Sequence, residues 1–195
     1  MDPSPDAGKT PLEPEELADL LPELFYKDQL NEWERENILQ ARYWALSPKR
    51  LRRLDPLTER YVRELHRRMF DHTWRWAGQY RRTEKNIGVA PEQIVSGIAA
   101  LLGDARYWSE NGTYGADEIA IRFHHRLVVI HPFPNGNGRH ARLMADVIAT
   151  RLGREEFSWG SRNLIQPGDA GRAYLESLRA ADAGDIAPLL AFSRK

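Results

Sequence analysis

The sequence predicts an all-α protein with one small β-hairpin. Apolar residues recur three and four positions apart along most of the chain, which is the spacing of one face of an α-helix. Glycine- and proline-containing turns separate these periodic segments. Residues 76–91 differ, because they alternate polar and apolar side chains between two glycines, as a hairpin does. The 195 residues are enough for one domain with a hydrophobic core.

Composition narrows the class of protein. Hydrophobic residues make up 42% and charged residues 29%, as in globular proteins of the aqueous phase. Lys+Arg and Asp+Glu both number 28, so bulk charge does not favour nucleic acid, and we expect no direct nucleic-acid contact. Without cysteine there are no disulfides, thiolate metal sites or cysteine nucleophiles. No signal sequence or membrane span is seen, so we expect a cytoplasmic protein without a membrane partner.

The N-terminal part is expected to be an arm followed by a short helix. Residues 1–13 are rich in proline, aspartate, glycine and serine, which favours loose order. Leucines at helical spacing then predict the short helix: Leu17, Leu20, Leu21 and Leu24. We therefore assign residues 1–28 to this arm and helix, and residues 29–195 to the main domain.

Further helices are predicted in the main domain from apolar periodicity and from end signals. Asp55 and Pro56 indicate a cap and a first turn, Pro91 opens a helix, and Gly153 ends one. The predicted helices cover residues 29–45, 56–72, 91–108, 117–130, 138–152, 170–181 and 186–192.

The segment HPFPNGNGRHAR, residues 131–142, is the strongest candidate for a functional site in the sequence. The second helix begins inside it, and a helix N-terminus offers unpaired N–H groups to an anion. Gly136 and Gly138 let the backbone approach a ligand, and Asn137 can donate its side-chain amide to a phosphate oxygen. Arg139 and Arg142 are three residues apart, so both lie on one face of the first turn, where they suit polyphosphate.

His131 and Phe133 complete this segment. His131 ends the preceding helix and is a candidate general base for a hydroxyl that attacks phosphorus. Phe133 is expected to anchor the loop in the core. The alternative is that this segment is only a turn, because glycine- and asparagine-rich segments between helices are usually turns and first-turn arginines are often solvated. The residues alone leave both readings open.

The segment resembles the signature of the Fic family, HxFx[D/E]GNGRxxR. The matching positions are His131, Phe133, Gly136, Asn137, Gly138, Arg139 and Arg142. The family has a helical core with a β-hairpin flap upstream of the signature, which residues 76–91 resemble. The resemblance extends over roughly residues 30–192 and is strongest to the branch called mobile mystery protein B. It implies a Fic fold, a helical bundle with a small hairpin flap beside the active-site loop.

The resemblance also implies an activity, protein adenylyltransfer, in which AMP passes from ATP to a hydroxyl side chain of a target protein. His131 would be the base, Asn137 and the loop amides would hold the α-phosphate, and Arg139 and Arg142 would hold the outer phosphates. The flap, around residues 79–88, would align the target protein as an added strand. The branch further implies a small helix-turn-helix partner encoded nearby.

One position departs from the signature. Asn135 stands where the family has an acidic residue that binds Mg²⁺, an ion that prefers anionic oxygens. Mg²⁺ can bind through ATP phosphates and the Asn135 carbonyl, or bind weakly and give slow catalysis. Alternatively, the protein is a nucleotide- or partner-binding module without turnover. Another phosphotransfer on the same scaffold, with a different nucleotide, with phosphocholine or in removal of AMP, is the remaining alternative.

A self-inhibitory glutamate is a further hypothesis. Many Fic proteins carry [S/T]xxxE[G/N] on a helix, and Glu36-Asn37 resembles its end, although Glu32 stands at the hydroxyl position. On this hypothesis Glu36 pairs with Arg142 and obstructs the γ-phosphate site. The alternative is an ordinary charged helix face.

Other residues are assigned to structure. His124 and His125 are adjacent and point to different sides of a helix, and with His131 and His140 they do not form a zinc motif such as HExxH. The six tryptophans are expected in the core. The basic segment KRLRR, residues 49–53, is expected to be a solvated turn, with a partner contact as the alternative.

Overall fold

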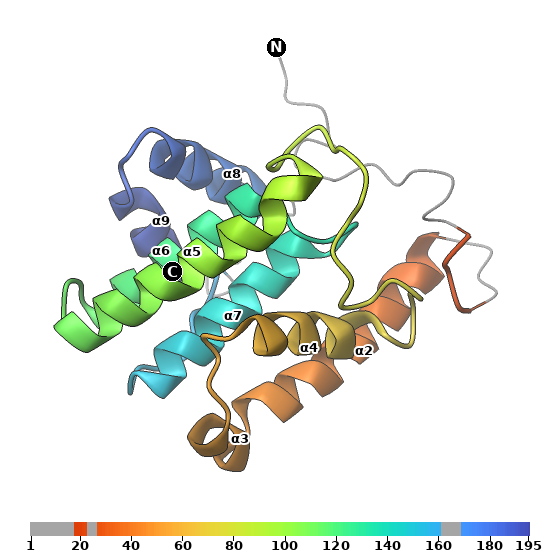
Figure 1. Ribbon diagram of the computed structural model, residues 1–195, viewed down its shortest axis with the longest axis horizontal. Coiled ribbons are helices and arrows are strands. Elements are labelled where there is room, and N and C mark those ends of the chain that lie inside the picture. The colour runs from red at the N-terminus through yellow and green to blue at the C-terminus, as the bar shows by residue number, and fades with distance from the viewer. Residues whose placement is uncertain (1–17, 23–26, 161–168) are drawn as a thin grey trace.

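A computed structural model describes residues 18–22, 27–160 and 169–195 (Figure 1). Its elements are α2 (Lys27–Leu46), α3 (Pro48–Arg53), α4 (Glu59–Phe70), the 3-10 turn η1 (Pro91–Gln93), α5 (Ile94–Asn111), α6 (Ala116–Ile130), α7 (Asn137–Arg151), α8 (Asp169–Asp182) and α9 (Ala187–Ser193). The all-α class is confirmed, and the helices predicted in the main domain are found within a few residues of their expected ends.

Helix α7 is the centre of the fold. It packs along α6 and also contacts α2, α3 and α4, while α5 covers α6 and the pair α8 and α9 packs together beside α6 (Figure 1). The inward residues of α7 are almost wholly buried, and full burial of a side chain the size of Met144 or Ile148 contributes about 1.5–3 kcal/mol. The start of α7 is therefore held in place by packing on two sides.

Helix α4 begins later than its sequence suggests. The Asp55 carboxylate accepts the Leu57 N–H (2.9 Å), and Thr58 is the true N-cap, because its hydroxyl accepts the Tyr61 N–H at 3.2 Å. Pro56 therefore lies in the turn before the helix and not in its first turn. The basic segment 49–53, expected as a turn, is part of the short helix α3, which Pro48 opens.

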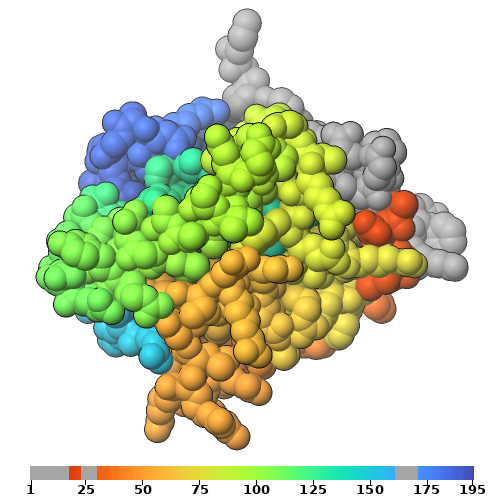
Figure 2. All heavy atoms as spheres, viewed as in Figure 1, coloured from red at the N-terminus to blue at the C-terminus, as the bar shows by residue number. Residues whose placement is uncertain are grey.

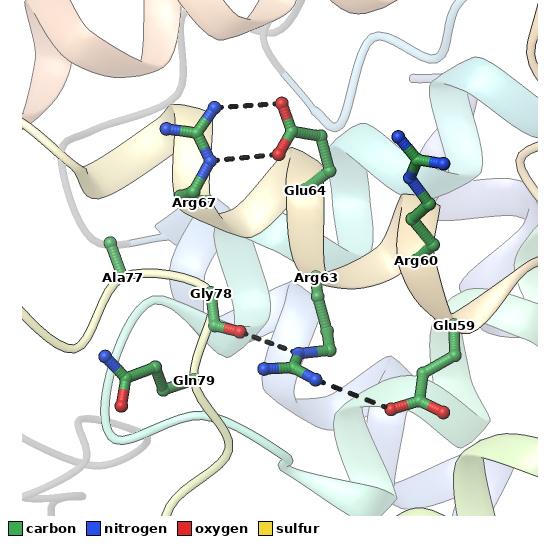
Figure 3. Close-up of a pocket in the computed structure, with 8 residues that line it drawn as sticks. All are labelled: Glu59, Arg60, Arg63, Glu64, Arg67, Ala77, Gly78 and Gln79. Carbon is green, nitrogen blue, oxygen red and sulfur yellow. Dashed lines mark hydrogen bonds and ion pairs between the residues drawn. The ribbon is translucent and has the colours of Figure 1, made fainter.

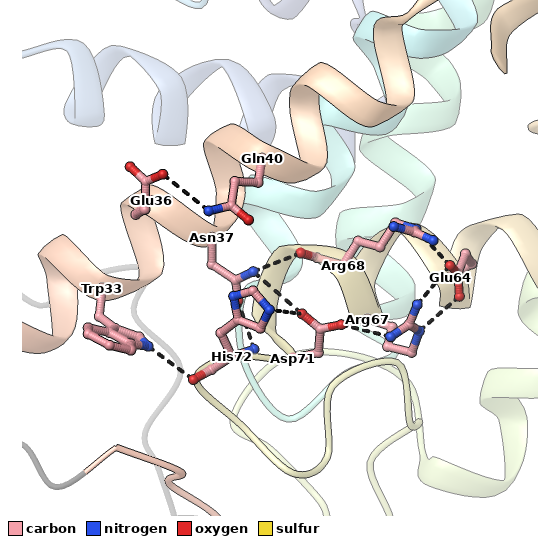
Figure 4. Close-up of polar contacts among 9 residues, drawn as sticks. All are labelled: Trp33, Glu36, Asn37, Gln40, Glu64, Arg67, Arg68, Asp71 and His72. Carbon is pink, nitrogen blue, oxygen red and sulfur yellow. Dashed lines mark hydrogen bonds and ion pairs between the residues drawn. The ribbon is translucent and has the colours of Figure 1, made fainter. Parts of the chain in front are cut away.

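The end of α4 is tied to α2 by one buried side chain. Asn37 donates from Nδ2 to the Arg68 carbonyl (3.0 Å), and its Oδ1 accepts the His72 N–H (3.1 Å) (Figure 4). One amide thus satisfies two backbone groups that the helix end leaves unpaired. The same figure shows the Trp33 indole donating to the His72 carbonyl at 3.0 Å.

The N-terminal helix prediction is wrong at the residues that can be compared. Residues 18 and 19 form a turn, and Leu20 makes an isolated antiparallel bridge with Trp74. Backbone bonds from Leu21 to Thr73 (2.8 Å) and from Arg75 to Asp19 (2.9 Å) hold this stretch against the chain that follows α4. The rest of the predicted arm and helix, residues 1–17 and 23–26, lies outside the described residues.

The predicted β-hairpin flap is also wrong, because residues 76–91 contain turns and bends but no strand. One backbone bond inside the segment closes a turn, from the Gln79 N–H to the Trp76 carbonyl (2.8 Å), and two others reach the end of α6 and the motif loop. The Arg81 N–H donates to the Pro132 carbonyl (2.9 Å) and the Val89 N–H to the Ile130 carbonyl (3.4 Å). In the space-filling view this segment, drawn in yellow and yellow-green, lies on the visible face of the molecule (Figure 2).

Within the described part of the chain, no helix combines the length and the apolar character needed to cross a membrane.

Candidate active site

The motif loop joins α6 to α7, and His131 stands at its first position. His131 caps α6 in the left-handed conformation (φ 52°, ψ 58°), and its N–H donates to the Leu127 carbonyl at 3.1 Å. A residue with a side chain pays roughly 1–2 kcal/mol for this conformation, so surrounding contacts must hold it. Strained backbone of this kind is frequent at functional sites.

Phe133 anchors the loop from inside. Its side chain is completely buried, and its ring stacks on the imidazole of His66 with centroids 3.6 Å apart and planes 14° apart. The rings of Tyr80 and His140 lie 5.5 and 5.1 Å away. The loop therefore turns around one aromatic side chain that several elements enclose.

Asn137 has a structural role that the sequence did not predict. Its Oδ1 accepts the Phe133 N–H (2.9 Å) and its Nδ2 donates to the Phe133 carbonyl (2.8 Å). The side chain is 3% exposed, so the expected donation to a phosphate oxygen would have to come from the second Nδ2 hydrogen or from the backbone N–H. The amide thus closes the loop on itself before any ligand arrives.

The two glycines of the loop differ. Gly136 has φ 77°, and a Cβ there would lie 2.5 Å from Cε2 of the buried Phe70 ring. A Cβ at Gly138 would meet nothing within 4 Å. Gly136 is therefore required by the fold, whereas Gly138 leaves open space above the first turn of α7.

His66 on α4 supports the loop from below and was not predicted. Its Nδ1 accepts the Gly78 N–H (3.0 Å), so its Nε2 carries the proton and donates to the Asn135 carbonyl at 3.1 Å. Complete burial holds the pKa of His66 well below its usual value, which keeps the ring neutral. A histidine among the apolar positions of α4 was the only sign of this role in the sequence.

His131 is in the protonation state that a base needs. Burial is the main cause that lowers its pKa to about 4, and the positive charges of Arg81 and Lys85 act in the same direction. A hydrogen bond with the Val128 backbone acts against them. The imidazole is therefore neutral at pH 7 and able to accept a proton.

The two arginines of the motif have different surroundings. Arg139 pairs with Glu34 of α2 (2.5 Å) and lies over the Phe70 ring at 5.0 Å. Glu34 is almost fully buried and also accepts the Trp74 indole N–H at 2.8 Å. Arg142 lies 5.5 Å from the centre of the Tyr174 ring and donates from Nε to the Gly138 carbonyl at 3.3 Å.

Glu36 does not form the pair with Arg142 that we hypothesised. It is exposed and accepts a hydrogen bond from Gln40 at 3.2 Å (Figure 4). Residues two positions apart lie on different faces of a helix, and it is Glu34 that faces the motif. Asn37, the second residue of the proposed inhibitory motif, is the buried link to α4 described above.

Asn135 offers little to a metal ion. Its Oδ1 already accepts the Gly136 N–H at 2.6 Å. Among the residues that the structure describes, no three side chains of the His, Cys, Asp and Glu types gather as a metal site. The other histidines weighed as zinc ligands have separate partners: His124 bonds Tyr174 (3.0 Å), His125 bonds Asp182 (2.8 Å) and His140 bonds the Val62 carbonyl (2.9 Å).

Only part of the loop reaches the surface. From His131 to Arg142, the half-exposed residues are Asn135, Gly138, Arg139 and Arg142, and the others are buried. A hollow of about 640 Å³ lies elsewhere, between α4 and residues 77–79, and none of the motif residues lines it (Figure 3). Arg63 closes one wall of that hollow by donating to the Gly78 carbonyl at 3.0 Å.

A helical domain whose central helix starts in such a loop, with a neutral histidine before it and two arginines after it, carries groups that could hold a phosphate. The family model of the Fic/DOC family matches residues 56–149, which run from the turn before α4 to near the end of α7. Residues 56–149 are therefore a Fic/DOC family domain.

Known relatives agree with this assignment. The protein adenylyltransferase fic-1 of Caenorhabditis briggsae is 31% identical over 141 residues, which are 69% of this chain and 26% of that protein. The chain thus spans about a quarter of the length of that relative.

Solved structures share the fold. Fic-1 of C. elegans superposes with a TM-score of 0.66 and 24% identity over 92% of this chain and 51% of that chain. BepC of Bartonella tribocorum, solved with bound AMPPNP, gives a TM-score of 0.67 and 17% identity over 88% and 87% of the two chains.

Proposed function

We propose that this protein is a protein adenylyltransferase that transfers AMP from ATP to a hydroxyl side chain of a target protein. The observation that carries the proposal is the pairing of a neutral, buried His131 with an open helix start. Gly138, Arg139 and Arg142 remain accessible there while the rest of the loop is packed. The relatives named protein adenylyltransferase support the same activity.

The chemistry follows from these positions. The His131 imidazole takes the proton of the target hydroxyl, whose oxygen attacks the α-phosphorus of ATP. The new P–O bond forms as the bond to the β-phosphate oxygen breaks, and pyrophosphate leaves. A positioned general base of this type contributes about 10²–10⁴-fold to a rate.

Phosphate binding would use the backbone and the arginines. The first N–H groups of α7 would hold the α-phosphate, in agreement with the open space above Gly138. Arg139 and Arg142 would bind the outer phosphates and neutralise the leaving pyrophosphate. Arg139 would exchange its bond with Glu34 for a phosphate oxygen, because the Glu34 carboxylate occupies it in this structure.

We propose that Mg²⁺ enters the site on the phosphates of ATP, with Asn135 as its one contact from the loop. The amide oxygen is neutral and already accepts the Gly136 N–H, so the protein supplies less charge than a carboxylate would. When bound, the ion would neutralise phosphate charge. The steps assigned above to His131 and the arginines do not pass through it.

Residues 79–88 are proposed to dock the target protein. The inner side of this segment is bonded to the motif loop through Arg81 and Val89, which leaves Arg82, Thr83 and Glu84 exposed. We further propose a cytoplasmic protein of the mobile mystery protein B branch, acting beside a small helix-turn-helix partner. The motif resemblance supports this assignment.

A second function is favoured by one observation, the occupied amide oxygen of Asn135. The protein would then be a nucleotide- or partner-binding module with little or no turnover. Transfer of another nucleotide or of phosphocholine, or removal of AMP, on the same loop is separated from AMP transfer by comparing these substrates.

The test is mass spectrometry of the purified full chain after incubation with ATP and Mg²⁺, beside His131→Ala. A mass gain of one AMP on the protein or on an added target, absent from the variant, supports adenylyl transfer. If the natural chain gains nothing and Asn135→Asp does, the binding-module function replaces the proposed one. If neither is labelled but both bind ATP, adenylyl transfer is wrong.

A further inference from the structure

Arg81 is a buried charged residue outside the motif. Its side chain is 3% exposed although it carries a guanidinium group. Nε donates to the His131 carbonyl (2.7 Å), Nη1 to the Thr83 carbonyl (2.9 Å), and Nη2 to the Val89 carbonyl. Its backbone N–H donates to the Pro132 carbonyl at 2.9 Å.

Burying the Arg81 guanidinium without a carboxylate partner is energetically unfavourable. Burial lowers the pKa of Arg81, and the groups that accept its side-chain N–H donors are three carbonyls and not a carboxylate. A buried charge normally has an opposite charge as its partner, because desolvation is expensive. The planar guanidinium fork can reach several carbonyl oxygens at fixed angles, which a lysine cannot do.

We propose that Arg81 is a positioning residue for His131. Its side-chain hydrogen bonds hold the segment 79–90 together as strand pairing would hold a hairpin flap. One guanidinium joins both arms of the segment 79–90, at Thr83 and Val89, to the carbonyl of the histidine itself. The contribution to catalysis rests on the proposed function, whereas the effect on the His131 ring does not.

The close fit of the segment supports this role. Gly88 has φ +105°, and a Cβ there would lie 2.7 Å from Arg81 Nη2 and 2.7 Å from the His131 Cβ. Glycine lets the second arm approach until its neighbour Val89 can bond the guanidinium. Fixing the His131 carbonyl also holds the left-handed backbone that aims the imidazole.

Arg81 acts on the same ring through its charge. Arg81 and Lys85, both from this segment, are the charged groups that depress the pKa of His131, in addition to burial. Geometry and charge can be separated experimentally. Arg81→Lys keeps the charge but cannot reach three carbonyls, whereas Arg81→Met removes both.

The experiment uses the full chain in two measurements that need no activity. The first is NMR titration of the histidine ring signals, with the His131 signal identified by its loss in His131→Gln. The second is amide hydrogen exchange of residues 79–90. Arg82→Met is the matched control, because Arg82 is the exposed neighbour on the same segment.

We expect Arg81→Met to raise the His131 pKa by about one pH unit and to speed exchange of residues 79–90 at least tenfold. Arg81→Lys should speed exchange but leave the pKa within about half that shift. Arg82→Met should change neither. AMP transfer, followed in parallel, should fall in both Arg81 variants, and Arg81→Met should move the acid limb of its pH profile upward.

Two results would overturn the proposal. In the first, Arg81→Met leaves both the His131 titration and the exchange at wild-type values. In the second, exchange rises but the His131 pKa does not move, so Arg81 holds the segment without acting on the histidine. If Arg81→Met does not fold, Arg81→Gln, which also removes the charge, takes its place in both measurements. If the wild-type chain transfers no AMP, the proposed function fails while this result on Arg81 still stands.

Discussion

The motif loop and the segment 79–90 lie against each other, but they are built in opposite ways. The loop is closed by its own residues, because Asn137 bonds both backbone groups of Phe133 and Asn135 accepts the Gly136 N–H. The segment 79–90 is bonded instead to the loop and to the end of α6, through the backbone N–H groups of Arg81 and Val89. The first region is held largely by bonds among its own residues, and the second by bonds that leave it.

This difference predicts that damage to the loop will affect both regions, whereas damage to the segment will stay local except at Arg81, which contacts His131. The predictions below test it in order of decreasing effect.

Acid should destabilise the loop more than any single substitution. Burial depresses the pKa values of His66, His131 and His140 around Phe133, to about 4 for His131 and about 3 for His140. The unfolded chain binds protons below pH 6.5 and the folded chain does not. Each histidine therefore removes about 1.4 kcal/mol of unfolding free energy per pH unit, from pH 6.5 down to its folded pKa. Urea unfolding between pH 7 and pH 4.5 measures this loss.

His140→Gln should reduce the slope of that loss with pH, because one proton-binding difference is removed. A slope that is unchanged in this variant would contradict the neutral state of His140.

Gly136→Ala should cost about 3 kcal/mol of unfolding free energy, since it forces a Cβ against Phe70 in a left-handed conformation. Gly138→Ala is the matched control. It adds a methyl group in open space on a helix, so stability should hold or rise by up to about 1 kcal/mol. ATP affinity should nevertheless fall in Gly138→Ala, measured by calorimetry. Equal losses of stability in the two variants would show that Gly136 does not pack closely against Phe70.

Asn137→Ala should cost about 2 kcal/mol, because it leaves the two buried backbone groups of Phe133 without partners. The comparison variant is Asn86→Ala in the segment 79–90, where the asparagine is exposed and the loss should stay below about 0.5 kcal/mol. Chemical denaturation measures both. If Asn86→Ala proved as costly as Asn137→Ala, the contrast between the two regions would be wrong.

Glu34→Gln should raise ATP affinity about fivefold, because it removes a partly exposed ion pair, worth up to about 1 kcal/mol, that competes with phosphate for Arg139. Glu36→Gln should leave the affinity unchanged, since Glu36 contacts Gln40 on the outer face of α2. An increase with Glu36→Gln and none with Glu34→Gln would restore our original assignment of the inhibitory role.

The sequence predicted the features that depend on residues close together along the chain. The helix periods, the position of the motif between α6 and α7 and the family signature could all be found along the chain. His131, Gly136 and Arg142 could be named for the same reason. The hairpin prediction failed because alternation of side chains shows an extended segment but not its hydrogen-bond partner, which here is the loop 50 residues later.

The site residues that were not predicted share one property: each contacts a residue that is far away in the sequence. Glu34 reaches Arg139 over 105 residues, and His66 reaches Asn135 over 69. The hypothesised pair between Glu36 and Arg142 failed by helix face, because Glu34, two residues earlier, is the glutamate that faces the motif, and only the packing of α2 on α4 shows this. Asn37 was noticed as part of a motif, but its bonds to Arg68 and His72 could not be read from it.

The stacked tryptophans give the protein an optical reporter. Trp74 and Trp76 lie with ring centroids 5.0 Å apart and planes 20° apart, and Trp76 is 6.1 Å from the His66 ring that supports Phe133. Trp74 also donates to Glu34, the partner of Arg139. The fluorescence of this pair should therefore respond both to the His66–Phe133 contact and to the Glu34–Arg139 ion pair, and a ligand that draws Arg139 away from Glu34 should change its intensity without any added dye.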